Sequence, residues 1–213
     1  MTESYTPNAA HLSMLSDLRK RGIRDERVLA AMSRIPRHLF LPESQRENAY
    51  GRRPVPIGWE QTISTSFIVA SMTEALELTG CERVLEIGTG CGYQTAVLCE
   101  TAGSVHSIEI IPSLAKQAAQ TLASLGYHPE LRINDGAMGW PEEAPFDRII
   151  WAATTPYIPE AWLAQCTPDA LLIGPQEERE NEVLVRLRGT PSGFVRDLLY
   201  GVRFVPMTGA VRG

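Results

Sequence analysis

The chain has 213 residues, of which 44% are apolar and 21% charged, so it is long enough for one domain with a substantial core and short for two. Its formal net charge is −5 and it contains no run of Lys or Arg, which disfavours a nucleic-acid partner. The stretch MTESYTPNAA lacks a basic region followed by an apolar one, and no window approaches the roughly 18 apolar residues of a membrane span. We therefore expect a cytoplasmic protein that does not associate with membranes.

Two short helices are expected within residues 8–35. The stretch NAAHLSMLSDLRKRG closes on Gly22, a residue typical of helix ends. Asp25 is placed to accept hydrogen bonds from the first turn of ERVLAAMSRI, and Pro36 ends that second helix. The chain therefore begins with a helical segment.

From Arg83 onward the sequence alternates between strand and helix patterns. The predicted helices are CGYQTAVLCETAG and PSLAKQAAQTLASLG, the second with Pro112 near its start and Gly126 past its end. The predicted strands are RVLEIG, SVHSIEI, ELRIND, FDRIIWAA and DALLIGP. Alternation of this kind predicts an α/β fold, a doubly wound and mostly parallel sheet with helices on both faces.

The residues that follow each strand are the candidates for ligand binding, because ligands of such sheets lie at the carboxyl ends of the strands. After the first strand comes EIGTGCGY, in which Gly88, Gly90 and Gly92 let the backbone approach a ligand closely. Glu109 follows the second strand, where a carboxylate can accept hydrogen bonds from both ribose hydroxyls, and Asp135 follows the third. Together these residues predict a nucleoside pocket.

The spacing of the glycines indicates which nucleoside is bound. The dinucleotide fingerprint GxGxxG would require glycine at position 93, where the chain has Tyr93, so NAD is disfavoured. The pattern is ExGxGxG, and Glu86 before the glycines would repel a pyrophosphate but suit a cationic ligand. S-adenosylmethionine has no phosphate and carries an ammonium and a sulfonium, and it is the predicted cofactor. A tight strand-to-helix turn without a ligand is the alternative explanation of the glycines.

Four stretches resemble successive blocks of the protein-L-isoaspartate O-methyltransferase family: VLEIGTGCGYQTAVL, PIGWEQTIS, NDGAMGWPEEAPFDRIIWAAT and VRFVPMTG. The likeness extends from about residue 35 to the C-terminus. It implies a Rossmann-like, S-adenosylmethionine-dependent methyltransferase fold with an N-terminal helical extension. It also implies methyl transfer to the free carboxylate of L-isoaspartyl residues in damaged proteins or peptides. The ester would then close to a succinimide, which opens partly to normal aspartate.

The resemblance implies a single methyltransferase domain over residues 1–213, in which residues 1–80 supply helices and the active-site loop and residues 81–213 supply the cofactor-binding sheet core and C-terminal strands. The peptide is expected to contact Ile63 and Val205. No metal is expected, since the four cysteines form no CxxC pair, and we expect a monomer.

The expected cofactor-binding residues are Glu86, Gly88, Thr89, Gly90, Gly92, Glu109, Asp135 and Gly136. For Asp135, near the adenine, the alternative is an Asp-Gly turn closed by its own side chain.

The expected chemistry requires no general base, because a carboxylate with a pKa of about 3.9 is already ionised at neutral pH. The enzyme must instead align the carboxylate oxygen with the methyl carbon and sulfur. Hydroxyl donors suit this task better than Lys or Arg, which would hold the nucleophile's lone pairs. By similarity to the family's active-site serine, Ser64 is the predicted donor, with Thr62 as a second and Gln61 supporting the loop. Alternatively, Ser64 or Thr65 could cap the helix SFIVASMTEALEL.

The C-terminal stretch YGVRFVPMTG, residues 200–209, alternates in the manner of a strand and is predicted to end or turn at Pro206. By resemblance it lies beside the TIS loop and holds an extended peptide through backbone hydrogen bonds. The alternative is a core strand with a loose tail.

Three residues depart from the family pattern AYxDxPxPIGxGQTISxP: Arg52 replaces its Asp, Glu60 its second Gly and Ser66 its last Pro. Arg52 and Glu60 favour an alternative, a methyltransferase of the same fold that acts on a different carboxylate, such as aspartate in a specific peptide. A catalytically silent S-adenosylmethionine-binding module is disfavoured by Ser64, and a dinucleotide oxidoreductase by Tyr93.

Overall fold

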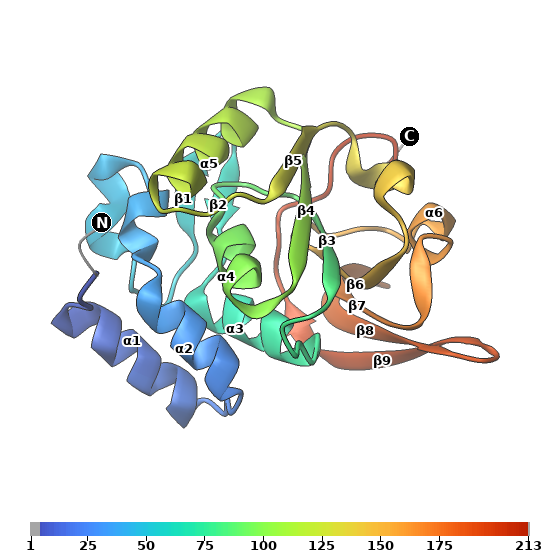
Figure 1. Ribbon diagram of the computed structural model, residues 1–213, viewed down its shortest axis with the longest axis horizontal. Coiled ribbons are helices and arrows are strands. Elements are labelled where there is room, and N and C mark those ends of the chain that lie inside the picture. Colours follow the sequence, from blue (N-terminus) through green and yellow to red (C-terminus); the bar gives the residue numbers. More distant parts are fainter. Residues whose placement is uncertain (1–4, 213) are drawn as a thin grey trace.

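A computed structural model describes residues 5–212, so Met1 to Ser4 of the N-terminal stretch considered above lie outside the described residues. Its seven-stranded sheet has the order β5–β4–β3–β6–β7–β8–β9 (Figure 1). The first five strands in this order pair in parallel, and β8 and β9 add antiparallel pairs. The strands are β3 Arg83–Ile87, β4 Ser104–Glu109, β5 Glu130–Ile133, β6 Phe146–Trp151, β7 Cys166–Glu178, β8 Asn181–Thr190 and β9 Gly193–Val202. The predicted α/β fold with a mostly parallel sheet is confirmed.

Helices cover both faces of the sheet. One face packs against α3 (Ser66–Ala75), α4 (Tyr93–Thr101) and α5 (Pro112–Ser124), and the other against α6 (Glu160–Leu163) and the short turns η3 (Gly136–Met138) and η4 (Pro141–Glu143). Successive side chains of a strand point to opposite faces. Accordingly, Val84 belongs to the buried cluster that includes Met72 of α3, and Leu85 to the cluster that includes Trp162 of α6.

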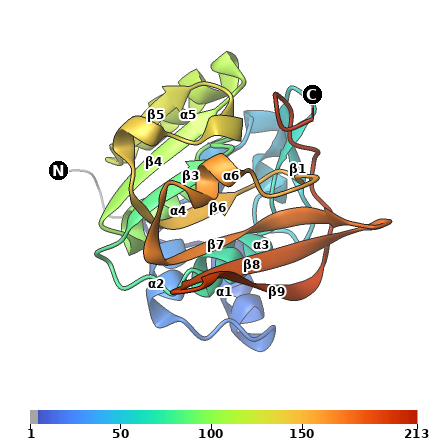
Figure 2. The ribbon, with the colours of Figure 1, turned by 90° about the vertical axis from the view of Figure 1, so that its right-hand side faces the viewer.

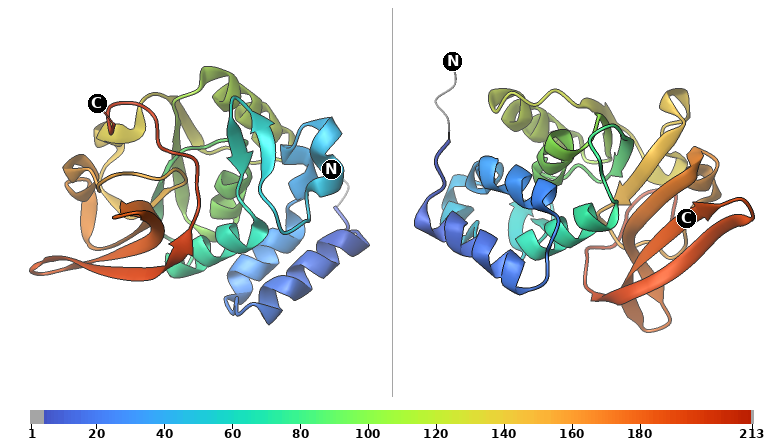
Figure 3. Two further views of the ribbon diagram at one scale, coloured as in Figure 1. Left: turned by 180° about the vertical axis from the view of Figure 1, so that it is seen from behind. Right: turned by 60° about the horizontal axis from the view of Figure 1, so that its bottom comes forward.

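The N-terminal helices form as the sequence predicts. Helix α1 covers Ala9–Lys20, and α2 covers Glu26–Arg34, whose first turn donates two backbone N–H groups to the Asp25 carboxylate. Helix α2 packs against α4 and α1 against α3 (Figures 1 and 3). The helical extension therefore supports the layer that carries α3 and α4. No helix within residues 5–212 is long and apolar enough to span a membrane.

The C-terminal segment differs from its prediction as a strand over residues 200–209. Strand β9 ends at Val202, and the chain then leaves the sheet. Beyond it, the Thr154 N–H donates to the Val205 carbonyl at 2.8 Å and the Met207 N–H donates to the Thr154 carbonyl at 2.9 Å. This bridge uses the Val205 carbonyl and the Met207 N–H and needs no N–H from Pro206, and it is where residues 203–212 pair with the sheet.

Two hairpins were not predicted. Strands β8 and β9 form a long hairpin at one edge of the sheet (Figure 2). A smaller hairpin consists of β1 (Val55–Gly58) and β2 (Gln61–Ile63) and leads directly into α3. Before it lie the short turns η1 (Arg37–Phe40) and η2 (Glu43–Asn48). The small hairpin and the C-terminal segment lie on the same side of the molecule (Figure 3).

Candidate functional site

A cavity opens at the carboxyl ends of the central strands, where the strand order reverses around β3. Its walls come from the β1–β2 hairpin and the start of α3, the glycine loop after β3, the residues after β4, and the C-terminal segment. The predicted site residues that line it are Thr62, Ile63, Ser64, Gly88, Thr89, Gly90, Glu109, Gly136 and Val205. Segments far apart in sequence are therefore brought together as predicted, whereas Glu86, Gly92 and Asp135 lie outside the lining.

The glycine loop requires its glycines for conformational reasons. Gly88 and Gly90 have φ values of +95° and +55°, in the left-handed region that side chains rarely adopt. Gly92 caps α4 and faces away from the cavity, since a Cβ there would lie 3.1 Å from the Leu122 side chain. The first two glycines therefore shape the cavity wall, and Gly92 allows α4 to pack against α5.

Glu109 lies at the end of β4 and is 5% exposed, with its carboxylate beside the glycine loop. One carboxylate oxygen accepts a hydrogen bond from the Gly90 N–H at 2.7 Å, and the other accepts one from the Ile111 N–H at 2.9 Å. Each carboxylate oxygen has a further lone pair. Glu109 is thus rigidly held and still able to accept hydrogen bonds from a ligand in the cavity.

Glu86 is buried beneath the cavity lining. Its Oε2 accepts hydrogen bonds from the hydroxyls of Thr95 at 2.5 Å and Ser107 at 2.7 Å, while its Oε1 has no partner among residues 5–212. The Ser107 hydroxyl also lies 2.6 Å from that of Thr89, which lines the cavity. Burial raises the pKa of Glu86 to about 7. Hydrogen bonds through the Ser107 and Thr89 hydroxyls therefore connect the Glu86 carboxyl group with the cavity wall.

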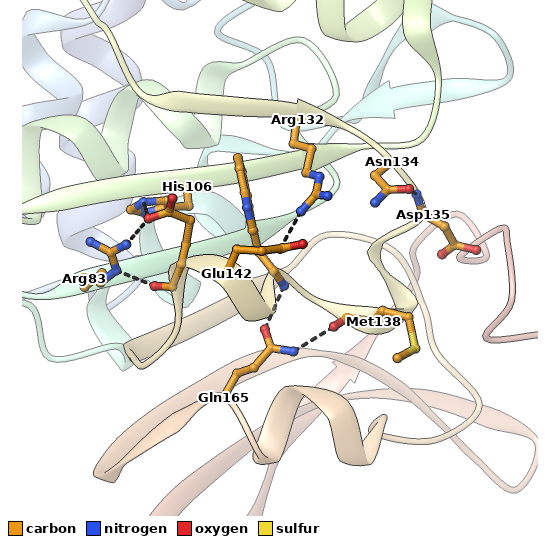
Figure 4. Close-up of polar contacts among 10 residues, drawn as sticks. Arg83, His106, Arg132, Asn134, Asp135, Met138, Glu142 and Gln165 are labelled. Atoms are coloured by element: carbon orange, nitrogen blue, oxygen red, sulfur yellow. Dashed lines mark hydrogen bonds and ion pairs between the residues drawn. The ribbon is translucent and has the colours of Figure 1, made fainter.

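Asp135 closes the turn that follows β5, as in the alternative considered for it. Its carboxylate accepts hydrogen bonds from the Ala137 N–H at 2.9 Å and, across the fold, from the Ala210 N–H at 2.7 Å. The same loop is held by the Gln165 amide, which donates to the Met138 carbonyl at 2.7 Å (Figure 4). Asp135 therefore fixes the loop that carries Gly136 and ties the C-terminal segment to it.

The hydroxyls of Ser64 and Thr65, at the start of α3, have different surroundings. Thr65 is the N-cap, and its hydroxyl oxygen accepts the Ile68 N–H at 3.3 Å. Ser64 lines the cavity, and its hydroxyl makes no hydrogen bond with any described residue. Capping therefore does not occupy Ser64. Thr62 also lines the cavity and is exposed.

The cavity wall carries few charged side chains. Its lining within residues 5–212 contains no Lys, Arg or His, and Glu109 is its charged side chain. Burial raises the pKa of Cys91 to about 11 and that of Tyr93 to about 12, so both are neutral near pH 7. A phosphate would find no cation here, whereas a positively charged nucleoside would be favoured. No group of three or more potential metal ligands occurs among the described residues.

Sequence reasoning missed most of the apolar wall. Ile57 of β1 and Met72 of α3 reach the cavity through tertiary packing, so no local sequence pattern marks them. Ile110 and Ile111 directly follow Glu109, and their position after a strand was an available signal.

The fold and the cavity define a Rossmann-like α/β protein with a nucleoside-type site at its switch point. A family model described as protein-L-isoaspartate(D-aspartate) O-methyltransferase matches residues 9–212. The chain belongs to this family, which confirms the resemblance seen in the sequence.

Relatives and solved structures agree with this membership. The chain is 50% identical over 195 residues to protein-L-isoaspartate O-methyltransferase 1 of Syntrophobacter fumaroxidans, covering 91% of each chain. It is 47% identical over 193 residues to the enzyme of Gloeobacter violaceus, covering 90% of this chain and 94% of the relative. A solved protein-L-isoaspartate O-methyltransferase superposes with a TM-score of 0.85 at 25% identity, covering 94% of this chain and 67% of the other. A Plasmodium falciparum protein assigned to the same family, solved with S-adenosyl-L-homocysteine, has the same fold (TM-score 0.81, 24% identity, 93% and 98% covered).

Proposed function

We propose that the protein transfers a methyl group from S-adenosylmethionine to the free carboxylate of L-isoaspartyl residues in damaged proteins or peptides, which initiates repair through a succinimide. The observation that carries the proposal is the unengaged Ser64 hydroxyl, which lines the same cavity as the glycine loop and Glu109. Membership of the isoaspartate methyltransferase family supports the choice of substrate.

The residues of the cavity fit the cofactor. Glu109 is placed to accept the ribose hydroxyls, and the backbone at Gly88 and Gly90 allows close approach. The absence of cationic side chains from the described lining suits a sulfonium. When bound, S-adenosylmethionine supplies an electrophilic methyl group. Glu86 lies beneath the loop and is linked to Thr89 of the cavity wall through the Ser107 hydroxyl. Because burial raises its pKa to about 7, it carries only part of a negative charge near neutral pH.

The protein's task in the reaction is alignment. An isoaspartyl carboxylate is ionised at neutral pH and needs no base, and the neutral Cys91 and Tyr93 in the wall supply none. Ser64, with Thr62, donates hydrogen bonds that orient the carboxylate without binding all its lone pairs. Ile63 and Val205 also line the cavity and contact the peptide.

Methylation of aspartate in one specific peptide is the second candidate, raised by the departures from the family pattern. Arg52 forms an ion pair with Asp17 of α1, so its charge is already matched within the fold. Ser66 is buried in the first turn of α3, where its hydroxyl has no partner among the described residues. Glu60 lies in the β1–β2 turn, and none of the three departures contributes a side chain to the cavity wall, which favours the isoaspartyl substrate.

The proposal treats residues 1–213 as one domain, because α1 and α2 share a buried cluster with β1, β2, α3, α4 and α5. A monomer in the cytoplasm stays a prediction from the sequence.

The test is transfer of a labelled methyl group to matched isoaspartyl, aspartyl and D-aspartyl peptides. We expect label in the isoaspartyl peptide and background label in the aspartyl peptide. Label in the aspartyl peptide alone would favour the second candidate. Binding of S-adenosyl-L-homocysteine without transfer to any peptide would indicate a silent binding module.

A further inference from the structure

Arg37 is a buried cation without a carboxylate partner. Its side chain is fully buried within η1, and no ion pair joins it to any acidic group among residues 5–212. Burial lowers the pKa of its guanidinium, although an arginine still stays protonated near neutral pH. Burying an unpaired charge is costly, so a residue that only filled space here would be better apolar.

The contacts of Arg37 lead to the proposed active-site loop. Its Nε donates to the Ala49 carbonyl at 2.7 Å, and one terminal nitrogen, Nη2, donates to the Ser64 carbonyl at 2.6 Å. Its guanidinium carbon lies 4.6 Å from the centre of the Tyr93 ring. Tyr93 is the first residue of α4, directly after the glycine loop. The planar guanidinium of Arg37 therefore connects the Ser64 backbone with the first residue of α4.

We propose that Arg37 is a positioning residue that fixes the Ser64 hydroxyl relative to the glycine loop, an inference that rests on the proposed role of Ser64. The guanidinium has donors in one plane and a flat face, so it holds two carbonyls while stacking on an aromatic ring. A lysine ammonium cannot reproduce this geometry, although it keeps the charge. The remaining nitrogen, Nη1, has no partner among the described residues, so the two carbonyl contacts carry the function.

The matched control is Arg148 in β6. It also donates to two backbone carbonyls, those of Leu76 at 2.6 Å and Asp147 at 2.8 Å, and it does not line the cavity. Arg37→Lys and Arg148→Lys therefore remove similar hydrogen bonds at different places. Because Arg148 is less buried than Arg37, a purely structural Arg37 would show as a larger loss of stability in Arg37→Lys, with kcat/KM of both folded variants near that of the wild type.

We would measure isoaspartyl peptide methylation, S-adenosyl-L-homocysteine affinity and hydrogen exchange of residues 61–65 for both variants, and combine Arg37→Lys with Ser64→Ala. We expect Arg37→Lys to lower kcat/KM at least tenfold, with affinity for S-adenosyl-L-homocysteine within twofold and faster exchange of the loop. Arg148→Lys should stay within twofold in all three measurements. In the Ser64→Ala background, Arg37→Lys should cost less than a further twofold, because residues that act through one group are not additive.

Equal losses in both arginine variants, or an additive loss in the double variant, would overturn the inference. Arg37→Gln, which removes the buried charge, is the second variant if Arg37→Lys does not fold, and the same results are expected of it. If the wild-type protein does not methylate the isoaspartyl peptide, the proposed function is wrong. The inference about Arg37 is then tested by hydrogen exchange of residues 61–65 alone, and unchanged exchange in Arg37→Lys would overturn it.

Discussion

Replacing Ser64 with alanine is the sharpest perturbation of the proposed site. The structure leaves the Ser64 hydroxyl without a partner among the described residues, so its removal breaks no hydrogen bond of the fold. A hydrogen bond to a charged group is worth about 1.5–3 kcal/mol. Loss of one such bond to the reacting carboxylate should therefore lower kcat/KM for an isoaspartyl peptide by about 10- to 150-fold.

The adjacent Thr65 provides the control for this experiment. Its hydroxyl caps α3, so Thr65→Ala should lower the free energy of unfolding by about 1 kcal/mol and leave the methylation rate near that of the wild type. Steady-state methylation and denaturant unfolding of both variants distinguish the two roles. The reasoning is refuted if Ser64→Ala stays within twofold of the wild-type kcat/KM while Thr65→Ala loses activity.

Glu109→Gln should weaken S-adenosyl-L-homocysteine binding by about 1.5–3 kcal/mol, since an amide has one acceptor oxygen in place of two; unchanged affinity in calorimetry would contradict the ribose assignment. Glu86, whose pKa is raised by burial to about 7, favours the folded state while protonated, and this contribution is lost as pH rises from 4.5 through 7, by up to roughly 3 kcal/mol. The free energy of unfolding, measured between pH 5 and pH 8, should therefore fall less for Glu86→Gln than for the wild type. Parallel curves for the two proteins would contradict the raised pKa of Glu86. Glu60 has a φ of +59°, so Glu60→Gly should raise the free energy of unfolding by about 0.5–1 kcal/mol, and a destabilised variant would show that the residue is not strained.

Features governed by local physics were predictable from the sequence. The Asp25 cap and Pro112 at the start of α5 depend on neighbouring residues alone, and both are confirmed. Glu109 and the glycine loop were predicted to meet because parallel strands end at the same edge, and the Gly90 N–H does donate to Glu109.

Features governed by distant contacts were not predictable in this way. The β1–β2 turn is formed by Trp59 and Glu60, both with positive φ, whereas the residues typical of such turns are Gly, Asn and Asp. The contact of Asp135 with the Ala210 N–H and that of Arg37 with the Ser64 carbonyl join segments far apart in sequence. The β8–β9 hairpin was missed although its turn, Pro191 and Ser192 followed by Gly193, was visible in the sequence.

The most direct test of the proposed function follows an isoaspartyl peptide to its product. The purified peptide would be incubated with the protein and S-adenosylmethionine, and its isoaspartyl and aspartyl forms would be separated by chromatography over time. We predict that the aspartyl form accumulates only when both protein and S-adenosylmethionine are present, and more slowly with Ser64→Ala. An isoaspartyl peptide that stays unconverted with folded, S-adenosyl-L-homocysteine-binding protein would contradict the proposal.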